Sequence, residues 1–318
     1  MKKPFTFYAH RKNFFLISIA IMIIGIIGIF VRGVQLDIQF TGGAILKYTY
    51  QGELNAEAVA DEASTLLGRL TTAQVTKDLN TGENRVVLNL AGEYGMSSAE
   101  QDEFLVKLNE KFPTAQFVNA ESSLVQPFFG QRFLERSILA VVLALLLILI
   151  YEWITFRKIG GLLAGLSALV ALFHDLLVVF FTCVIAGIPI GDSFVAVALS
   201  IIGYSINDTI VVFDRIRENR RIYAKESLET IADLSVSQSM TRSVNTNIAV
   251  TIAVSLIYFL AMRSSLDSVI SFALPMTIGS ISGCYSTICL CGPLWVMMQK
   301  RREKNRPEPG KKPATSKA

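Results

Sequence analysis

A carboxylate with two polar neighbours interrupts an apolar stretch in the second half of the chain. Asp208 lies between Asn207 and Thr209 in a run from Ser193 to Val212 that holds no other charged residue. A carboxylate at bilayer depth costs about 2.5 to 3.5 kcal/mol on insertion scales, so it is a functional hypothesis by default. Helical spacing places Ser205 on the same stripe as Asp208, and this polar stripe must face other helices or water rather than lipid.

The candidate partner of Asp208 is Arg242, which lies where the next apolar run, from Ser243 to Met262, begins. Arg242 shares a polar helical stripe with Asn245 and Thr246. A nearby arginine favours the charged form of a carboxyl group, while burial favours its neutral form. A group held between these two influences can take up and release a proton as its surroundings move. A static salt bridge that joins two helices explains the same residues, and charge placement alone leaves both explanations open.

A second pair of titratable residues lies within another apolar run. His174 and Asp175 stand near the middle of the stretch from Ile159 to Ile190 and are its only interruptions. Adjacent side chains on a helix point about 100° apart, so the two cannot line the same wall of a bundle. One of them could meet the Asp208 site and join a proton path. A hydrogen-bonded pair that links two helices is the simpler explanation.

Long apolar runs define the class of protein, because about 18 or more such residues can cross a bilayer as a helix. Hydrophobic residues make up 52% of the 318 residues, more than a soluble domain of this length needs. The runs predict an α-helical polytopic membrane protein with six transmembrane helices. They are Phe14–Val31, Ile138–Tyr151 with its flanking aromatic residues, Ile159–Ile190, Ser193–Val212, Ser243–Met262 and Ser268–Met298.

The runs divide the chain into five segments. We predict a cytoplasmic N-terminus, a first transmembrane helix, an extracytoplasmic domain, a five-helix membrane bundle with one long cytoplasmic loop, and a basic cytoplasmic tail. Their residues are 1–13, 14–32, 33–130, 131–298 with the loop at 214–241, and 299–318, respectively. Within the loop, the spacing of apolar residues from Glu226 to Met240 predicts an amphipathic helix at the cytoplasmic surface.

Lysine and arginine cluster before the first run, between the second and third, between the fourth and fifth, and after the sixth. By the positive-inside rule, this distribution places both termini in the cytoplasm. Basic loops are also found in proteins that bind nucleic acid. Topology and attraction to anionic membrane lipid explain them here, so we expect no nucleic-acid partner.

Residues 33–130 form a polar island whose pattern predicts an α+β domain between the first and second transmembrane helices. Strand-like and helix-like stretches follow one another in the order βαββαβ, which is the ferredoxin-like arrangement. Gly42 and Gly43 permit a sharp hinge turn where this domain begins. The domain has no histidine or cysteine and its acidic residues are scattered, so a binding or mechanical role fits it better than catalysis.

Nothing in the sequence predicts an enzyme or a bound cofactor. The four cysteines lie in or near apolar runs and lack the Cys-x-x-Cys spacing of metal sites. The sequence offers no nucleophile–base pair and no nucleotide-binding loop. No cofactor is expected, and the relay explanation of Asp208 makes the proton the expected coupling ion.

Several of these stretches resemble one known family. The stretch around Asp208, GYSINDTIVVFDRIRENRR, closely resembles a signature of SecF proteins, the bacterial protein-export membrane subunits of the SecD/SecF family. FTGG at the start of the outer domain, LFHDLL in the third run and TRSVNT before the fifth run are also similar to SecF, and the likeness covers nearly the whole chain. One departure is Ala44, where the family often has threonine, and it affects only the local turn.

The resemblance implies a fold related to the RND transporters and a SecD partner that supplies a matching six-helix half. It implies work with the SecYEG channel and the SecA ATPase in the bacterial cytoplasmic (inner) membrane, with YajC as a further candidate partner. Such proteins use the proton motive force to promote late translocation of unfolded secretory polypeptides. In the family, the aspartate of the GYSxND motif and an arginine entering the next span belong to the proton path. These positions are Asp208 and Arg242 here, so the resemblance favours the relay explanation, with Asn207 and Thr209 beside it.

Two other classes of function remain as alternatives. A small-molecule exporter of the RND type predicts a second half in the same chain, and the 318 residues show no internal repeat. A purely structural assembly subunit would hold partners together without moving protons. The substitution Asp208→Asn discriminates between relay and scaffold, because it removes the charge and leaves the shape of the side chain nearly unchanged.

Overall fold

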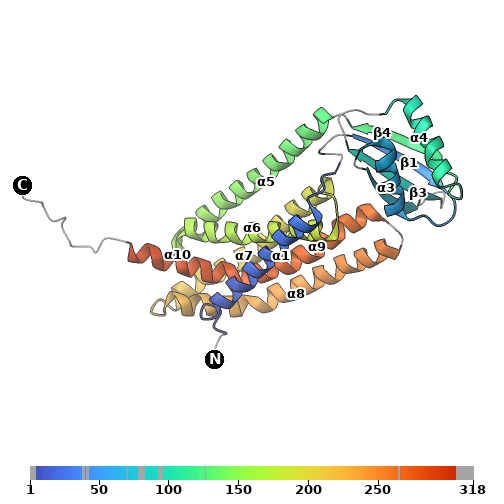
Figure 1. The fold of residues 1–318 in the computed structure, drawn as a ribbon. Coiled ribbons are helices and arrows are strands. Elements are labelled where there is room, and N and C mark those ends of the chain that lie inside the picture. The colour runs from blue at the N-terminus through green and yellow to red at the C-terminus, as the bar shows by residue number, and fades with distance from the viewer. Residues whose placement is uncertain are drawn as a thin grey trace, which may run out of the picture.

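The computed structural model describes residues 5–37, 40, 43–69, 71–77, 83–91, 96–125, 127–263 and 266–305. Within them, the chain forms a bundle of long helices with a small α+β domain at one end (Figure 1). α10 (Gly292–Lys304) and the start of α1 (Arg11–Arg32) lie at the opposite end of the bundle from that domain. The predicted fold class, a helical membrane bundle with an inserted α+β domain, is confirmed.

The small domain follows the predicted βαββαβ order. Its elements are β1 (Gly43–Tyr50), α3 (Ala56–Leu67), β2 (Thr71–Lys77), β3 (Asn84–Ala91), α4 (Ser98–Lys111) and β4 (Val118–Val125). The strands pair antiparallel in the order β2-β3-β1-β4, which is the ferredoxin-like topology. Gly43 opens β1, whereas Gly42 lies outside the described residues, so the predicted hinge turn stays a prediction.

One face of this sheet is buried by the two helices of the domain. Every second residue of β1 points into the core, as the period of two along a strand requires. Val59 of α3 and Phe104 of α4 belong to the same core. Ser97 caps α4 by accepting a hydrogen bond from the amide of Glu100, and the Glu100 carboxylate accepts one from the amide of Ser97. The domain therefore has a hydrophobic core of its own.

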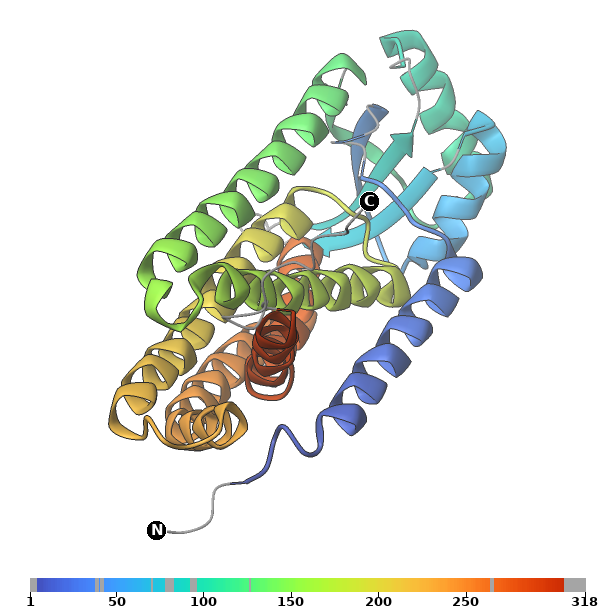
Figure 2. The same cartoon turned by 90° about the vertical axis from the view of Figure 1, so that its left-hand side faces the viewer.

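Within the described ranges, six helices are long and apolar enough to cross a membrane. They are α1, α5 (Pro127–Thr155), α6 (Gly161–Ala186), α7 (Asp192–Ile222), α8 (Leu228–Arg263) and a last helix that includes α9 (Asp267–Tyr285) and α10. In the apolar windows of α6, α7 and the last helix, 50% or more of the residues are buried, against 11% or less in the others. These three helices therefore form the centre of the bundle, and Figure 2 shows α1 and α5 on opposite sides of it.

The segment between the fourth and fifth apolar runs is more helical than predicted. α7 continues to Ile222, and α8 begins at Leu228, where the amphipathic helix was expected, but α8 runs on without a break into the fifth apolar run. Ile231 and Val236 are buried in the core of the bundle, and no glycine or proline follows them before the end of the fifth apolar run. An amphipathic segment and a membrane-spanning segment thus form one continuous helix.

The last helix changes its winding near its middle. The residues Ser286–Cys291, here named η2, form a π-helix between α9 and α10. π-helical turns are wider than α-helical turns, are rare, and occur frequently at functional sites. Just before η2, Gly279 approaches α6 and α7 so closely that an added Cβ would lie 2.7 Å from Val179 and 2.8 Å from Ile201. The wide turn therefore follows a tightly packed part of the bundle.

Candidate functional site

Asp208 lies on the inner side of α7, facing α8. Only 4% of the residue is exposed, and its Oδ2 accepts a hydrogen bond of 2.9 Å from Nδ2 of Asn247 on α8. Ser243 lies one turn before Asn247 on the same face of α8 and is also buried. Next to Asp208, the hydroxyl of Thr209 shares a hydrogen bond of 3.0 Å with a threonine hydroxyl of η2. Asp208 and its neighbour therefore connect α7 to both α8 and η2.

Arg242 does not pair with Asp208 in this structure. The side chain of Arg242 is exposed, because it points about 100° away from the next residue of α8, which is buried. Its charge is still close enough to act on Asp208. Asn245 and Thr246 share the exposed face with Arg242, as the predicted stripe requires. The direct partner of Asp208 is therefore an amide rather than the predicted guanidinium group.

Asn207 also points away from the core of the chain. It is exposed on α7, although the residue that follows it is buried. Both α7 and α8 thus present polar side chains to the outside of the bundle. Ionisable and polar residues within membrane helices rarely face lipid and usually face other helices or water. These exposed positions are therefore candidates for contact with another helical protein.

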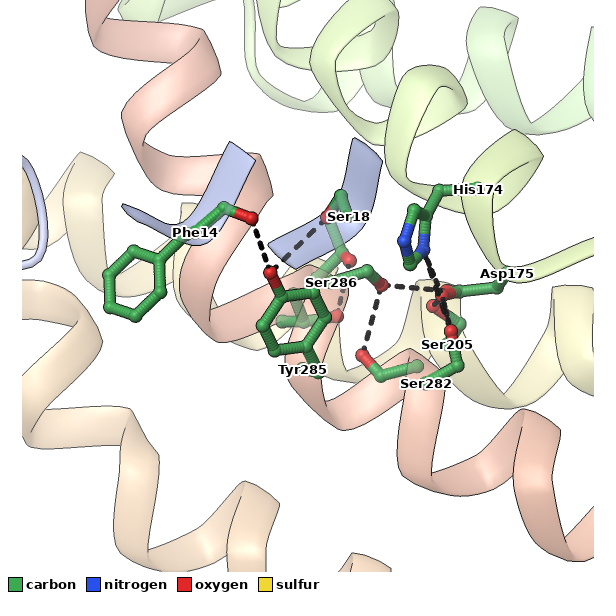
Figure 3. A network of polar contacts seen from close by, with 11 residues as sticks. Phe14, Ser18, His174, Asp175, Ser205, Ser282, Tyr285 and Ser286 are labelled. Atoms are coloured by element: carbon green, nitrogen blue, oxygen red, sulfur yellow. Dashed lines mark hydrogen bonds and ion pairs between the residues drawn. The ribbon is translucent and has the colours of Figure 1, made fainter. Parts of the chain in front are cut away.

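A second carboxyl group, that of Asp175 on α6, is enclosed by three serine hydroxyls (Figure 3). Its Oδ2 accepts hydrogen bonds from Ser205 of α7 at 2.8 Å and from Ser286 of η2 at 2.7 Å. Its Oδ1 accepts a hydrogen bond from Ser282 of α9 at 2.6 Å. Asp175 itself is 0% exposed. These four residues, here called the serine cradle, join α6, α7 and the last helix.

His174 lies at the edge of the serine cradle. Its Nδ1 is 3.2 Å from Oδ1 of Asp175, and its Nε2 is buried without a hydrogen-bond partner among the described residues. His174 lines a mainly apolar cavity of about 440 Å³ between α1, α6 and α9. Nearby, the hydroxyl of Tyr285 donates to the carbonyl of Phe14 in α1 at 2.6 Å (Figure 3). Both neighbours approach Ser282 of α9, so the prediction that they cannot line the same wall is wrong, although Asp175 alone makes the contact with α7.

Four partners in these sites were not predicted from the sequence: Asn247, Ser282, Ser286 and Thr287. The two serines are four residues apart, which places them on one helix face. Gly283 lies between them, where an added Cβ would come within 3.3 Å of Cβ of Ser205. Serine and glycine are common packing residues at contacts between membrane helices, so this pattern alone does not indicate a carboxylate partner.

The two carboxyl sites are close along α7. Ser205 of the serine cradle precedes Asp208 by three residues, so both lie on one face of the helix. Buried carboxyl groups surrounded by hydroxyl and amide groups can bind or release a proton when those partners move. In the described part of the chain, no group of three or more histidine, cysteine and acidic side chains is placed to hold a metal ion. Proton exchange is the chemistry that this arrangement offers.

The inserted ferredoxin-like domain and the polar centre of the helical bundle define a polytopic membrane protein built around buried carboxyl groups. Residues 105–301 match the family described as "Protein export membrane protein SecD/SecF, C-terminal". Relatives named protein translocase subunit SecF match over nearly their full length. That of Anaerolinea thermophila is 33% identical, with 96% of this chain and 98% of the relative covered. That of Petrotoga mobilis is 28% identical, with 94% and 97% covered. The chain belongs to the SecF family.

Two solved structures share this fold. The crystal structure of SecDF from Thermus thermophilus, described as a translocon-associated membrane protein, has a TM-score of 0.75 and 24% identity over 94% of this chain. A crystal structure of SecDF in the super-membrane-facing form has a TM-score of 0.67 and 22% identity over 96% of this chain. This chain spans 39% and 40% of the length of those two chains, respectively.

Proposed function

We propose that this chain acts with a SecD partner to promote the late translocation of unfolded secretory polypeptides, driven by the proton motive force. Membership of the SecF family supports a role in protein translocation. The observation that carries the proton coupling is the burial of Asp208 between α7 and α8. An ionisable group inside a membrane bundle marks a functional site by default.

Asn247 offers Asp208 two alternative hydrogen bonds. Its Nδ2 donates to Asp208, whereas its Oδ1 has no hydrogen-bond partner among the described residues. A protonated Asp208 can donate to that oxygen once the amide turns over. Protonation would then change a contact between α7 and α8, and the amide would give up the hydrogen bond of 3.0 Å that Nδ2 also donates to the carbonyl of Ser243. The pair therefore has two arrangements, and a proton selects between them.

The energy available from each proton is large enough to bias such a switch. A charge that crosses the membrane potential yields about 2.3 kcal/mol per 100 mV. A pH gradient adds about 1.4 kcal/mol per unit. About 5.5 kcal/mol shifts a two-state population from 1:99 to 99:1. A few protons per cycle therefore supply enough free energy to reverse the preferred arrangement of the helices.

The small domain is placed to follow a movement of the bundle. β4 ends at Val125 and α5 begins at Pro127. Because these two elements are so close along the chain, a shift of α5 would also move the end of β4. α9 also contacts β2. In our proposal, a shift of these helices tilts the domain, which holds the emerging polypeptide and resists its return through the channel.

We assign the exposed polar positions of α7 and α8 to contact with SecD. Asn207, Arg242, Asn245 and Thr246 are exposed in this chain alone. This chain matches 39% of the SecDF chain from Thermus thermophilus, and a separate SecD chain would supply the rest. SecD would then cover these groups and enclose Arg242 near Asp208. The SecYEG channel, the SecA ATPase and YajC are further proposed partners, on the basis of the family resemblance.

The proposed location is the bacterial inner membrane, with both termini in the cytoplasm and the small domain outside. The placement of basic residues supports this orientation. The small domain also lies at the opposite end of the bundle from α10 and the start of α1 (Figure 1). Lipid would surround the exposed apolar sides of α1, α5 and α8. We propose no enzymatic activity, no cofactor and no nucleic-acid partner, with protons as the coupling ion.

The test is export into sealed inverted vesicles that contain the chain and its SecD partner. Wild type is compared with Asp208→Asn, with and without a proton gradient, after both are shown to assemble equally. The matched control is Asp192→Asn, because Asp192 is an exposed carboxylate at the start of the same helix. We expect Asp208→Asn to lose the contribution of the gradient to late translocation and Asp192→Asn to keep it. If Asp208→Asn responds as wild type does, Asp208 has a structural role and the proposed coupling through it is wrong.

A further inference from the structure

Glu152 is a fully buried carboxyl group that the proposed function does not use. It lies in the last turn of α5, and 0% of the residue is exposed. Neither of its carboxyl oxygens has a hydrogen-bond partner among the described residues. Buried side-chain oxygens in proteins are nearly always hydrogen-bonded, so two unpaired oxygens on one carboxyl group require an explanation.

The surroundings of Glu152 offer no compensating cation. On α6, Gly165 lies beside it, and an added Cβ there would be 3.6 Å from Cβ of Glu152. Cys291 of η2 is close enough to feel the charge of Glu152 and also that of Asp175 on α6. Cys291 is thus the titratable group that faces Glu152 from η2, and Asp175 of α6 lies on the far side of Cys291.

Three cations lie further along the chain, around Phe156. Arg217 of α7 lies 5.9 Å above the ring of Phe156 and forms an ion pair with Asp214. Arg157 and Lys158 belong to the short helix η1 (Arg157–Ile159), which follows α5. Within the described residues, none of these cations forms an ion pair with Glu152, so its burial is not compensated by charge.

An uncompensated buried carboxylate is so costly that the group binds a proton instead. Glu152 is therefore neutral in this conformation. For comparison, Asp175 accepts hydrogen bonds from three serine hydroxyls, as a carboxylate does. Two buried carboxyl groups thus have opposite environments, one rich in donors and one without partners.

η2 lies between these two environments. It begins at Ser286, which donates to Asp175, and it ends at Cys291, which is close to Glu152. Ser167 of α6 is buried near Cys291, and it lies two turns before Asp175 on the same face of α6. A buried line of polar groups therefore runs along α6 and η2 from one carboxyl group towards the other.

We propose that Glu152 is a second proton-binding site of the membrane bundle, which holds its proton in this conformation and releases it when η2 changes its winding. On release, the O–H bond of Glu152 breaks, and the proton passes to water or to the carboxylate of Asp175. No other bond changes and no electron is transferred. The inference rests on the proposed proton coupling, and it adds a site on a different pair of helices from Asp208.

The direct test is infrared difference spectroscopy of the full chain with its SecD partner in lipid vesicles. The difference between neutral and alkaline conditions reports the carbonyl absorption of protonated carboxyl groups. We expect wild type to lose such an absorption on alkalinisation and Glu152→Gln to lack that change. Glu135→Gln is the matched control, because Glu135 is an exposed glutamate on the same helix. It should keep the wild-type difference spectrum.

A second measurement is the stimulation of export by a proton gradient in inverted vesicles. Glu152→Gln should reduce this stimulation several-fold and Glu135→Gln should leave it unchanged. If Glu152→Gln does not assemble, Glu152→Asp takes its place and must shift the same infrared absorption. A wild-type difference spectrum that persists unchanged in Glu152→Gln or Glu152→Asp overturns the inference. If Asp208→Asn loses the gradient response in the same vesicles, the proposed function stands even when the Glu152 inference fails.

Discussion

The substitution Asp175→Asn should weaken the contact between α6, α7 and the last helix. In the serine cradle, Oδ2 of Asp175 accepts from Ser205 and Ser286, and Oδ1 accepts from Ser282. In the variant, the amide oxygen can replace only one of these two oxygens. The amide NH₂ then faces hydroxyls that donate in the wild type, so at least one serine must turn to accept instead.

The size of the effect follows from the number of hydrogen bonds. A hydrogen bond to a charged group contributes about 1.5 to 3 kcal/mol, against about 0.5 to 1.5 kcal/mol between neutral groups. Loss of the charge therefore weakens each of the three bonds by about 1 kcal/mol, or about 3 kcal/mol in total. Hydrogen bonds between membrane helices average only about 0.6 kcal/mol, which sets a lower value of about 2 kcal/mol. We expect Asp175→Asn to lower the free energy of unfolding by about 2 to 3 kcal/mol.

The assay is reversible unfolding of the solubilised chain by a denaturing detergent, followed by circular dichroism. Asp192→Asn is the matched control, since its exposed carboxylate should change the stability by less than about 0.5 kcal/mol. Ser282→Ala removes one donor and should cost about 1 kcal/mol. An Asp175→Asn variant as stable as wild type would refute the reasoning, because it would mean that the serine hydroxyls contribute nothing through the charge.

Three further changes test packing and electrostatics elsewhere. Gly279→Ala should lower the free energy of unfolding by about 1 to 3 kcal/mol, since the added Cβ would lie 2.7 Å from Val179, and detergent unfolding measures it. Tyr48→Phe should keep or raise the stability of the small domain by up to about 1 kcal/mol, because the Tyr48 hydroxyl is buried without a described partner. Burial raises the pKa of Tyr48 from 10.0 to about 12, so wild type should lose more stability than Tyr48→Phe between those pH values, as hydrogen exchange can show. Hydrogen bonds from Ser97 lower the pKa of Glu100. They should therefore stabilise α4 at pH values above the ordinary glutamate pKa, and this stabilisation should be lost as the pH falls through the lowered pKa of Glu100. Hydrogen exchange in α4 should show this pH dependence in wild type and a smaller one in Ser97→Ala, which removes the hydroxyl donor and keeps the backbone amide that also donates to Glu100.

The small domain could be predicted in detail because its strands are half-buried. In β1, apolar and polar residues alternate, and each buried residue of the pattern reaches the core that α3 and α4 cover. The bundle could be predicted only as a set of spans, since apolar residues occur on all sides of a membrane helix. The amphipathic helix at the start of α8 was predicted, but its continuity with the fifth span was not, because its residues are too polar for a membrane span, although Ile231 and Val236 bury one side of them.

The partners of the buried acids were harder to predict than the acids themselves. Helical spacing correctly placed Arg242 with Asn245 and Thr246 on one stripe, but it does not say which way that stripe turns. Packing against α7 selected the neighbouring face of α8, so an amide instead of the guanidinium group reaches Asp208. Glu152 stands beside a tryptophan at the end of an apolar run, a position typical of the membrane interface, and only the fold shows that it is buried.

The π-helix η2 lies next to all three acidic sites. Ser286 donates to the serine cradle, Thr287 is hydrogen-bonded to the neighbour of Asp208, and Cys291 lies close to Glu152. A rewinding of η2 into an α-helix would rotate its residues relative to one another, so it cannot preserve all three contacts at once. In our proposal, a proton bound at one site would therefore change the free energy of proton binding at the other two, although no acid touches another. In our proposal, the three acidic sites are coupled because the contacts of each depend on the winding of η2.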